Sequence, residues 1–240
     1  MIHTRWQARH AAVALLILVP ALFGVTAAAP LLAGSGLASF LVFAYLCRSD
    51  LRGALLANAL TAARVLAVFA VLVWHWSREG QLQQPWLAFA ILVAAEVTDY
   101  FDGRAARRRG PTQFGATFDM EVDAAVTAAL ALLAVLYRQA PAWLLAAGLW
   151  RYAYALWEAA LTRKWGKSDR ILPCDVSMPS WFRWQAKTIC VVAVLGLIIL
   201  STPGLSPPLL VGVSAGVVGL LSYSFVAGGA LLLRRGAAAR

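Results

Sequence analysis

The stretch from Asp99 to Asp123 reads DYFDGRAARRRGPTQFGATFDMEVD. The whole chain has only eleven acidic residues, and more than half lie in or just before this stretch: Glu96, Asp99, Asp102, Asp119, Glu121 and Asp123. Asp99 and Asp102 are three positions apart, which places them on one face of a helix. Asp119 and Asp123 are four positions apart and share a face in the same way. Because Gly110-Pro111 interrupts the helix between the two pairs, the stretch predicts a helical hairpin on which four carboxylates converge.

Four carboxylates this close together must either have raised pKa values or bind metal cations. Oxygen ligands alone favour a hard divalent ion, so we expect Mg²⁺ or Mn²⁺, with two ions shared by the four side chains. A two-metal site suits phosphoryl transfer. The neighbours fit this chemistry, since Gly103 leaves room for a ligand beside Asp102 and Arg107 can hold a phosphate oxygen. Gly115 precedes Asp119 by one helical turn and opens the face of the second arm.

The composition outside this stretch is that of a membrane protein. The 240 residues are 61% hydrophobic and 13% charged, with a mean hydropathy of +0.72. A soluble domain carries roughly twice that charged fraction. Apolar runs predict an all-α chain of eight membrane helices at about 11–29, 31–48, 54–76, 85–101, 117–138, 140–161, 185–201 and 207–233. The first run also resembles a signal peptide ending at Ala27-Ala28-Ala29, although we favour a retained span because the run is long.

The positive charges indicate an orientation. With the N-terminus in the cytoplasm, most of the 21 Lys and Arg residues lie on the cytoplasmic side, and only Arg78 and Arg138 lie outside. Arg64 and Arg151 remain near the middle of their helices, where a charge is costly and usually functional. The net charge of +10 is therefore read as a topology signal, with no nucleic-acid partner. The carboxylate site then faces the cytoplasm.

The stretch resembles the signature of the CDP-alcohol phosphotransferase family, D-x2-D-G-x2-A-R-x(7–8)-G-x3-D-x3-D, at every fixed position. Members of that family have six spans. The resemblance therefore implies a polytopic membrane helix bundle, with a six-helix core in residues 51–240 and about two extra N-terminal helices in 1–50. Asn58, Thr61 and Arg64 resemble the N-x2-T-x2-R pattern at the start of the family's first core helix.

The resemblance also implies roles for these residues. Asp99, Asp102, Asp119 and Asp123 would bind two divalent metal ions, and Asp123 would also act as the base. A donor pocket for the CDP group would be formed by Gly103, Ala106, Arg107, Gly115, Asn58 and Thr61. The implied reaction is attack of an alcohol on CDP-diacylglycerol with release of CMP, in which the lipid chains of the donor stay in the membrane.

The acceptor alcohol is less defined. Basic residues on the cytoplasmic side suit a phosphorylated acceptor such as glycerol 3-phosphate, and the spacing of Arg151 and Arg163 is similar to that of paired arginines in phosphatidylglycerophosphate synthases. Lys187-Thr188 resembles the end of a G-K-x-K-T segment, although Trp184 and Gln185 replace its first two fixed residues. We name Arg151, Arg163 and Lys187 as acceptor-binding candidates. Inositol phosphate, serine and choline stay open as acceptors.

Other functional classes are less consistent with the sequence. Intramembrane prenyltransferases carry two widely separated aspartate motifs, whereas here all four aspartates lie in one hairpin. An ion transporter would have acids in several helices, and a CDP-lipid-binding scaffold without catalysis would usually have lost an aspartate. The family resemblance implies a homodimer. The Ala- and Arg-rich composition suggests a bacterial inner membrane.

Overall fold

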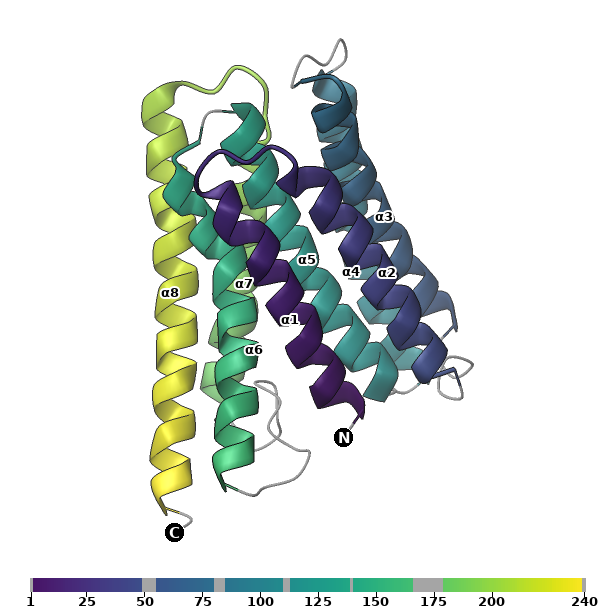
Figure 1. The fold of residues 1–240 in the computed structure, drawn as a ribbon, viewed down its shortest axis with the longest axis vertical. Helices are drawn as coiled ribbons and strands as arrows, with labels where there is room; N and C mark the ends of the chain where they lie inside the picture. The colour runs from purple at the N-terminus through teal and green to yellow at the C-terminus, as the bar shows by residue number, and fades with distance from the viewer. Residues whose placement is uncertain are drawn as a thin grey trace.

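The computed structural model describes residues 2–48, 55–79, 85–109, 113–138, 140–165 and 179–238. Within these ranges all regular structure is helical (Figure 1). The helices are α1 (Ile2–Ala21), α2 (Ala28–Leu46), α3 (Leu55–Ser77), α4 (Pro85–Arg109), α5 (Gln113–Arg138), the short 3₁₀ helix η2 (Ala142–Leu145), α6 (Ala146–Trp165), α7 (Ser180–Leu200) and α8 (Pro207–Ala238). The predicted all-α fold is confirmed.

Helix α5 is the centre of the bundle (Figure 1). It contacts α1, α2, α3, α6 and α7. Helices α2, α3 and α4 lie on one side of it, and α6 and α8 lie on the other side. The start of α1 and the end of α8 lie at the same end of the bundle. Because α5 touches most of the other helices, side chains on its different faces meet different partners.

Five helices are long and apolar enough to cross a membrane, at Ala28–Leu46, Asn58–Ser77, Phe114–Tyr137, Ser180–Leu200 and Pro207–Leu231, and these make the chain a multi-pass membrane protein. Eight spans were predicted, so three of the predicted helices do not meet this criterion within the described residues. Among the side chains of α4 that the structure describes, Pro85–Thr98 form a shorter apolar stretch. Helices α1 and α6 carry charged residues along their length, including Arg5, Arg9 and Arg151.

Several of the helices begin or end near glycine and proline residues, which are expected to interrupt a helix. Helix α4 ends at Arg109 and α5 begins at Gln113, so the predicted break at Gly110-Pro111 falls between the two helices. Helices α4 and α8 begin with Pro85 and Pro207, because proline has no amide hydrogen and the first turn of a helix needs none. The turns after α1 and α7 contain Gly24 at φ +80° and Gly204 at φ +79°, a backbone conformation that suits glycine.

Small residues let α5 and α6 approach each other closely. Ala124, Ala125, Ala128 and Ala129 of α5 are buried. A Cβ atom at Gly148 of α6 would lie 2.7 Å from the Cα atom of Ala128, which is too close for an unshifted structure. Helices in membranes associate through such contacts between small residues. Gly148 therefore sets the distance between α5 and α6.

We predict that Gly148→Ala destabilises the fold, because the new methyl group meets backbone atoms that cannot move aside. Overpacking of this kind costs about 1–3 kcal/mol in the free energy of unfolding. The matched control is Gly216→Ala in α8, where nothing lies within 4 Å of the new Cβ atom. Thermal unfolding in detergent should show a lower Tm for Gly148→Ala alone. Equal Tm values for the two variants would contradict the close approach of α5 and α6.

Candidate active site

Asp119 and Asp123 lie one helical turn apart on α5, and one arginine of α3 reaches both of them. Nη2 of Arg64 donates a hydrogen bond to Oδ1 of Asp123, and it lies 3.8 Å from Oδ1 of Asp119. The Arg64 side chain is 2% exposed, whereas those of Asp119 and Asp123 are 48% and 39% exposed. The two carboxylates therefore share one accessible face of α5, with a buried positive charge behind them.

The burial of Arg64 explains why α3 and α5 pack in this register. A guanidinium removed from water is costly unless it is paired with an opposite charge and forms hydrogen bonds. In a helix at membrane depth the cost is highest, so the cation faces the interior of the bundle. Asp119 and Asp123 supply the pairing charge. Sliding of α3 along α5 would break both of these contacts.

Two further polar residues of α3 lie on the N-terminal side of Arg64. Thr61 is buried, and Asn58 is half-buried. The Nδ2 atom of Asn58 is inaccessible to water and has no hydrogen-bond partner among the described residues. Because Asn58, Thr61 and Arg64 follow each other at three-residue intervals, they lie along one side of the helix. The three polar side chains therefore all lie in the N-terminal half of α3.

The first half of the motif lies on α4. Asp99, Asp102, Gly103, Ala106 and Arg107 all belong to this helix, but their side chains lie outside the described residues. Asp102 precedes the end of α4 by about two helical turns, and Asp119 follows the start of α5 by about the same distance. Gly115, in the first turns of α5, is half-buried. The two halves of the motif therefore lie near the ends of α4 and α5 that the chain segment 110–112 connects.

The residues present fit a divalent metal ion. Within the described part of the chain no three His, Cys, Asp or Glu side chains gather into a metal site, and Asp99 and Asp102 are not among the side chains searched. Asp119 and Asp123 offer carboxylate oxygens on an accessible face, which is the ligand type that Mg²⁺ and Mn²⁺ prefer. Arg64 offsets one of their two negative charges, so the pair keeps a net negative charge that a cation can neutralise. The donor set is therefore suited to a hard cation.

The acceptor-binding candidates are found in three different settings. Arg151, on α6, has an 11% exposed side chain and donates a hydrogen bond of 2.6 Å from Nη2 to Oε1 of Glu121. Its Nε and Nη1 atoms are buried and have no hydrogen-bond partner among the described residues. Arg163 lies near the end of α6, and its side chain is outside the described residues. Lys187 is exposed on α7.

Glu121 and Gln7 are contact residues to which the sequence motif assigns no role. The Glu121 side chain is fully buried, and its Oε1 atom also accepts a hydrogen bond of 3.0 Å from Nε2 of Gln7 in α1. The signal for Glu121 is present in the sequence, because an acid inside an apolar helix needs a partner. Gln7 has no comparable signal, since no spacing in the sequence connects the first helix with α5.

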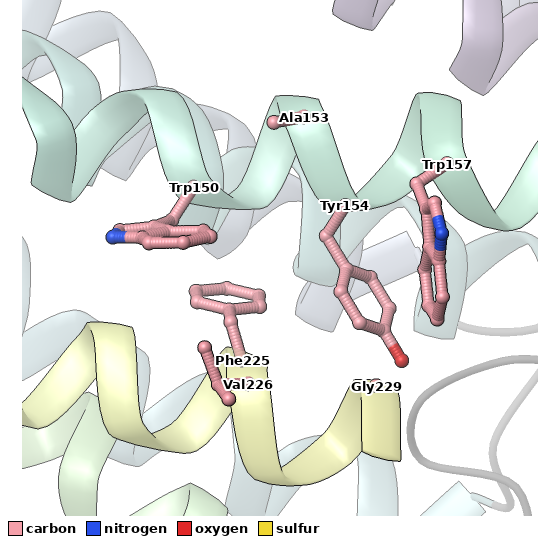
Figure 2. A pocket seen from close by; sticks show the side chains of 7 residues that line it. All are labelled: Trp150, Ala153, Tyr154, Trp157, Phe225, Val226 and Gly229. Carbon is pink, nitrogen blue, oxygen red and sulfur yellow. The ribbon is translucent and has the colours of Figure 1, made fainter. Parts of the chain in front are cut away.

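A separate cavity of about 240 Å³ lies between α6 and α8 (Figure 2). It is lined by Trp150, Ala153, Tyr154, Trp157, Phe225, Val226 and Gly229. Trp150 and Phe225 stack with their ring centroids 6.3 Å apart, and the Tyr154 hydroxyl points toward α8 beside Gly229. No carboxylate lines this cavity, so it suits apolar groups and is distinct from the aspartate face of α5.

The comparisons with known proteins agree with the motif. A sequence profile described as CDP-alcohol phosphatidyltransferase matches residues 54–227, which include α3 to α7 and most of α8. No curated protein and no solved structure matches the chain. Members of this family are transferases of lipid synthesis that act on CDP-alcohols and generally depend on metal ions. Since the match extends over more than half of the sequence, the chain belongs to the CDP-alcohol phosphatidyltransferase family.

Proposed function

We propose that this protein transfers the phosphatidyl group of CDP-diacylglycerol to a small phosphorylated alcohol, such as glycerol 3-phosphate, and releases CMP. The observation that carries the proposal is the contact of buried Arg64 with both Asp119 and Asp123. It puts two carboxylates of the family motif on one accessible face of the central helix. A membrane-embedded bundle also suits a donor whose acyl chains stay in the lipid while its headgroup reacts.

In this proposal the four aspartates hold two Mg²⁺ or Mn²⁺ ions: Asp99 and Asp102 from α4, and Asp119 and Asp123 from α5. When bound, such ions neutralise charge on a diphosphate and on the leaving phosphate. The CDP group of the donor lies against residues of both arms of the hairpin and of α3: Gly103, Ala106, Arg107, Gly115, Asn58 and Thr61. Their small side chains leave space, and their polar groups offer hydrogen bonds.

Asp123 acts as the base. It takes the proton of the acceptor hydroxyl while that oxygen forms a bond to the phosphorus of the phosphatidyl group. The bond from this phosphorus to the CMP oxygen breaks, and CMP leaves with the electron pair. Arg64 supports this role because its hydrogen bond to Oδ1 fixes the orientation of the Asp123 carboxylate. A fixed carboxylate removes part of the entropic cost of the proton transfer.

Arg151 binds the phosphate of the acceptor. Glu121 holds its Nη2 atom, and the other two nitrogen atoms keep donors that no described residue uses. A guanidinium with such free donors suits a phosphate oxygen. Arg163 and Lys187 add positive charge toward the same substrate. Inositol phosphate would use the same contacts, whereas serine or choline would need none of them.

The placement of the protein in the cell follows the charge pattern. We assign the aspartate site to the cytoplasmic side of a bacterial inner membrane, because most Lys and Arg residues then lie in the cytoplasm. Residues 51–240 form the catalytic core in this proposal, and residues 1–50 add α1 and α2 to it. A homodimer is the expected assembly.

The direct test is CMP release by the purified protein with CDP-diacylglycerol and Mg²⁺. Glycerol 3-phosphate, inositol 1-phosphate, inositol, serine and choline are offered separately as acceptors. We predict CMP release that requires a phosphorylated acceptor and is abolished by EDTA. Release with serine or choline would reject the acceptor assignment. Binding of CDP-diacylglycerol without CMP release with any acceptor would favour a non-catalytic lipid-binding protein.

We predict that Asp123→Asn lowers kcat about 1,000-fold, since general-base catalysis contributes roughly 10²–10⁴ to a rate. Binding of the CDP donor should persist, because three of the four aspartates remain. Glu79→Gln, which makes the same change from carboxylate to amide at an exposed position, is the matched control. A variant that binds the donor and keeps normal turnover would show that another group takes the proton.

For Arg151 we predict that replacement by lysine raises the acceptor KM about tenfold or more, from the loss of hydrogen bonds to a charged phosphate. Lysine keeps a positive charge beside Glu121, so the fold should be retained. The donor KM should change by no more than about twofold from the wild-type value, since in this proposal the donor does not contact Arg151. Arg9→Lys, at an exposed arginine, is the matched control. Equal rises in both KM values would indicate that Arg151 serves the structure alone.

A further inference from the structure

Glu121 is the centre of a buried polar contact among three helices. Its carboxylate has no exposed surface, and one oxygen accepts hydrogen bonds from Gln7 of α1 and Arg151 of α6. A buried carboxylate without partners destabilises a protein strongly, more so than a broken contact at the surface. The position of Glu121 therefore requires that α1 and α6 both remain in place against α5.

The contact lies on the opposite side of α5 from the aspartates. Glu121 is two residues from Asp119 and two from Asp123, and each residue turns the helix by about 100°. Arg64 of α3 holds the aspartate face, and Gln7 with Arg151 holds the Glu121 face. A rotation of α5 that moved the aspartates would have to break contacts on both sides of the helix. Two opposed sets of contacts thus fix the rotation of α5 about its axis.

Helix α1 is anchored independently next to Gln7. Nε1 of Trp6 donates a hydrogen bond of 3.0 Å to the backbone oxygen of Ser39, and Nδ1 of His10 lies 2.9 Å from the Ser39 hydroxyl. The Trp6 ring stacks on Phe43 with centroids 4.0 Å apart. These contacts join α1 to α2 and place the Gln7 side chain toward α5. Helix α1 precedes the region that the family profile matches, 54–227.

We infer that Glu121 is a positioning residue for Asp119 and Asp123, and that α1 takes part in the active site of this protein by holding Glu121 through Gln7. The inference rests on the proposed function, because it takes these aspartates as metal ligands. Groups that hydrogen-bond directly to metal ligands change metal affinity by about 10- to 100-fold when they are removed, and because Glu121 acts through the rotation of α5 we expect an effect at the lower end of that range. The consequence is that metal affinity depends on a helix outside the family-matched region.

The test is binding of Mn²⁺ to the purified protein without substrate, followed by the electron paramagnetic resonance signal of free Mn²⁺. Glu121→Gln should raise the Kd for Mn²⁺ about tenfold, because it weakens the contacts that fix the rotation of α5. Gln7→Leu removes only one partner of Glu121 and should raise the Kd about threefold. The matched control is Ser35→Ala, which removes a hydroxyl that hydrogen-bonds to the backbone oxygen of Leu32 within α2 and takes no part in the contacts of Gln7 or Glu121. Its Kd should equal that of the wild type.

A second variant distinguishes the loss of positioning from a loss of folding. Glu121→Gln leaves the buried Arg151 without a charged partner, whereas Glu121→Met with Arg151→Met replaces the whole pair by apolar side chains, a change that folds usually tolerate. The double variant should keep a Tm close to that of the wild type and still bind Mn²⁺ about tenfold more weakly. Because no acceptor is present, a role of Arg151 in acceptor binding cannot affect this result.

The possible outcomes separate the two proposals. Folded variants whose Kd for Mn²⁺ is unchanged would overturn the inference, as would a Ser35→Ala variant that weakens binding as much as Gln7→Leu. A rise of the acceptor KM in Glu121→Gln, with normal Mn²⁺ binding, would overturn it by showing that Glu121 orients Arg151 alone. If the wild type binds Mn²⁺, the variants weaken it, and no acceptor gives CMP, the inference holds and the proposed reaction fails. A wild type that binds no Mn²⁺ overturns both.

Discussion

The pairing of Arg64 with Asp119 and Asp123 is the interaction on which the rest of the arrangement depends. A buried guanidinium restricts how α3 can pack, because sliding α3 along α5 would break the contacts with both aspartates. It also sets the face that α5 presents, and the opposite face must then accommodate Glu121. The buried charges specify the register of the bundle. Apolar side chains can pack in several registers, so they specify it less well.

The sequence predicts the fold well for a physical reason. Apolar runs long enough to span a membrane must be helical, since every backbone group needs an internal partner there. The helix positions and the break at Gly110-Pro111 follow from this rule and from the chemistry of glycine and proline. All eight predicted helices are present, and within the described residues five of them are long and apolar enough to count as membrane spans. The charge of Arg151 in α6 serves a contact with Glu121 of α5, which hydropathy does not record.

The sequence also predicts only part of the candidate site. The spacing of Asp119 and Asp123 fixes their common face, because both lie on one helix. The contact of Arg64 with both, and that of Gln7 with Glu121, join helices that are far apart in the chain. Such contacts depend on how the helices pack, which no local spacing encodes. The family motif therefore identifies the metal-binding candidates, and the structure adds the residues that hold them in place.

The position of α1 bears on how a shared membrane core acquires additional parts. An added helix that packed only through apolar contacts would compete with lipid, whose chains are as apolar as the helix surface. A hydrogen bond to a buried carboxylate is different, since lipid offers no donor in its place. Gln7 supplies that donor to Glu121, and Trp6 and His10 hold it there through α2. Because the carboxylate of Glu121 is buried on the face of α5 opposite the aspartates, the helix that supplies its hydrogen-bond donor stays in the bundle for a reason that apolar packing does not provide.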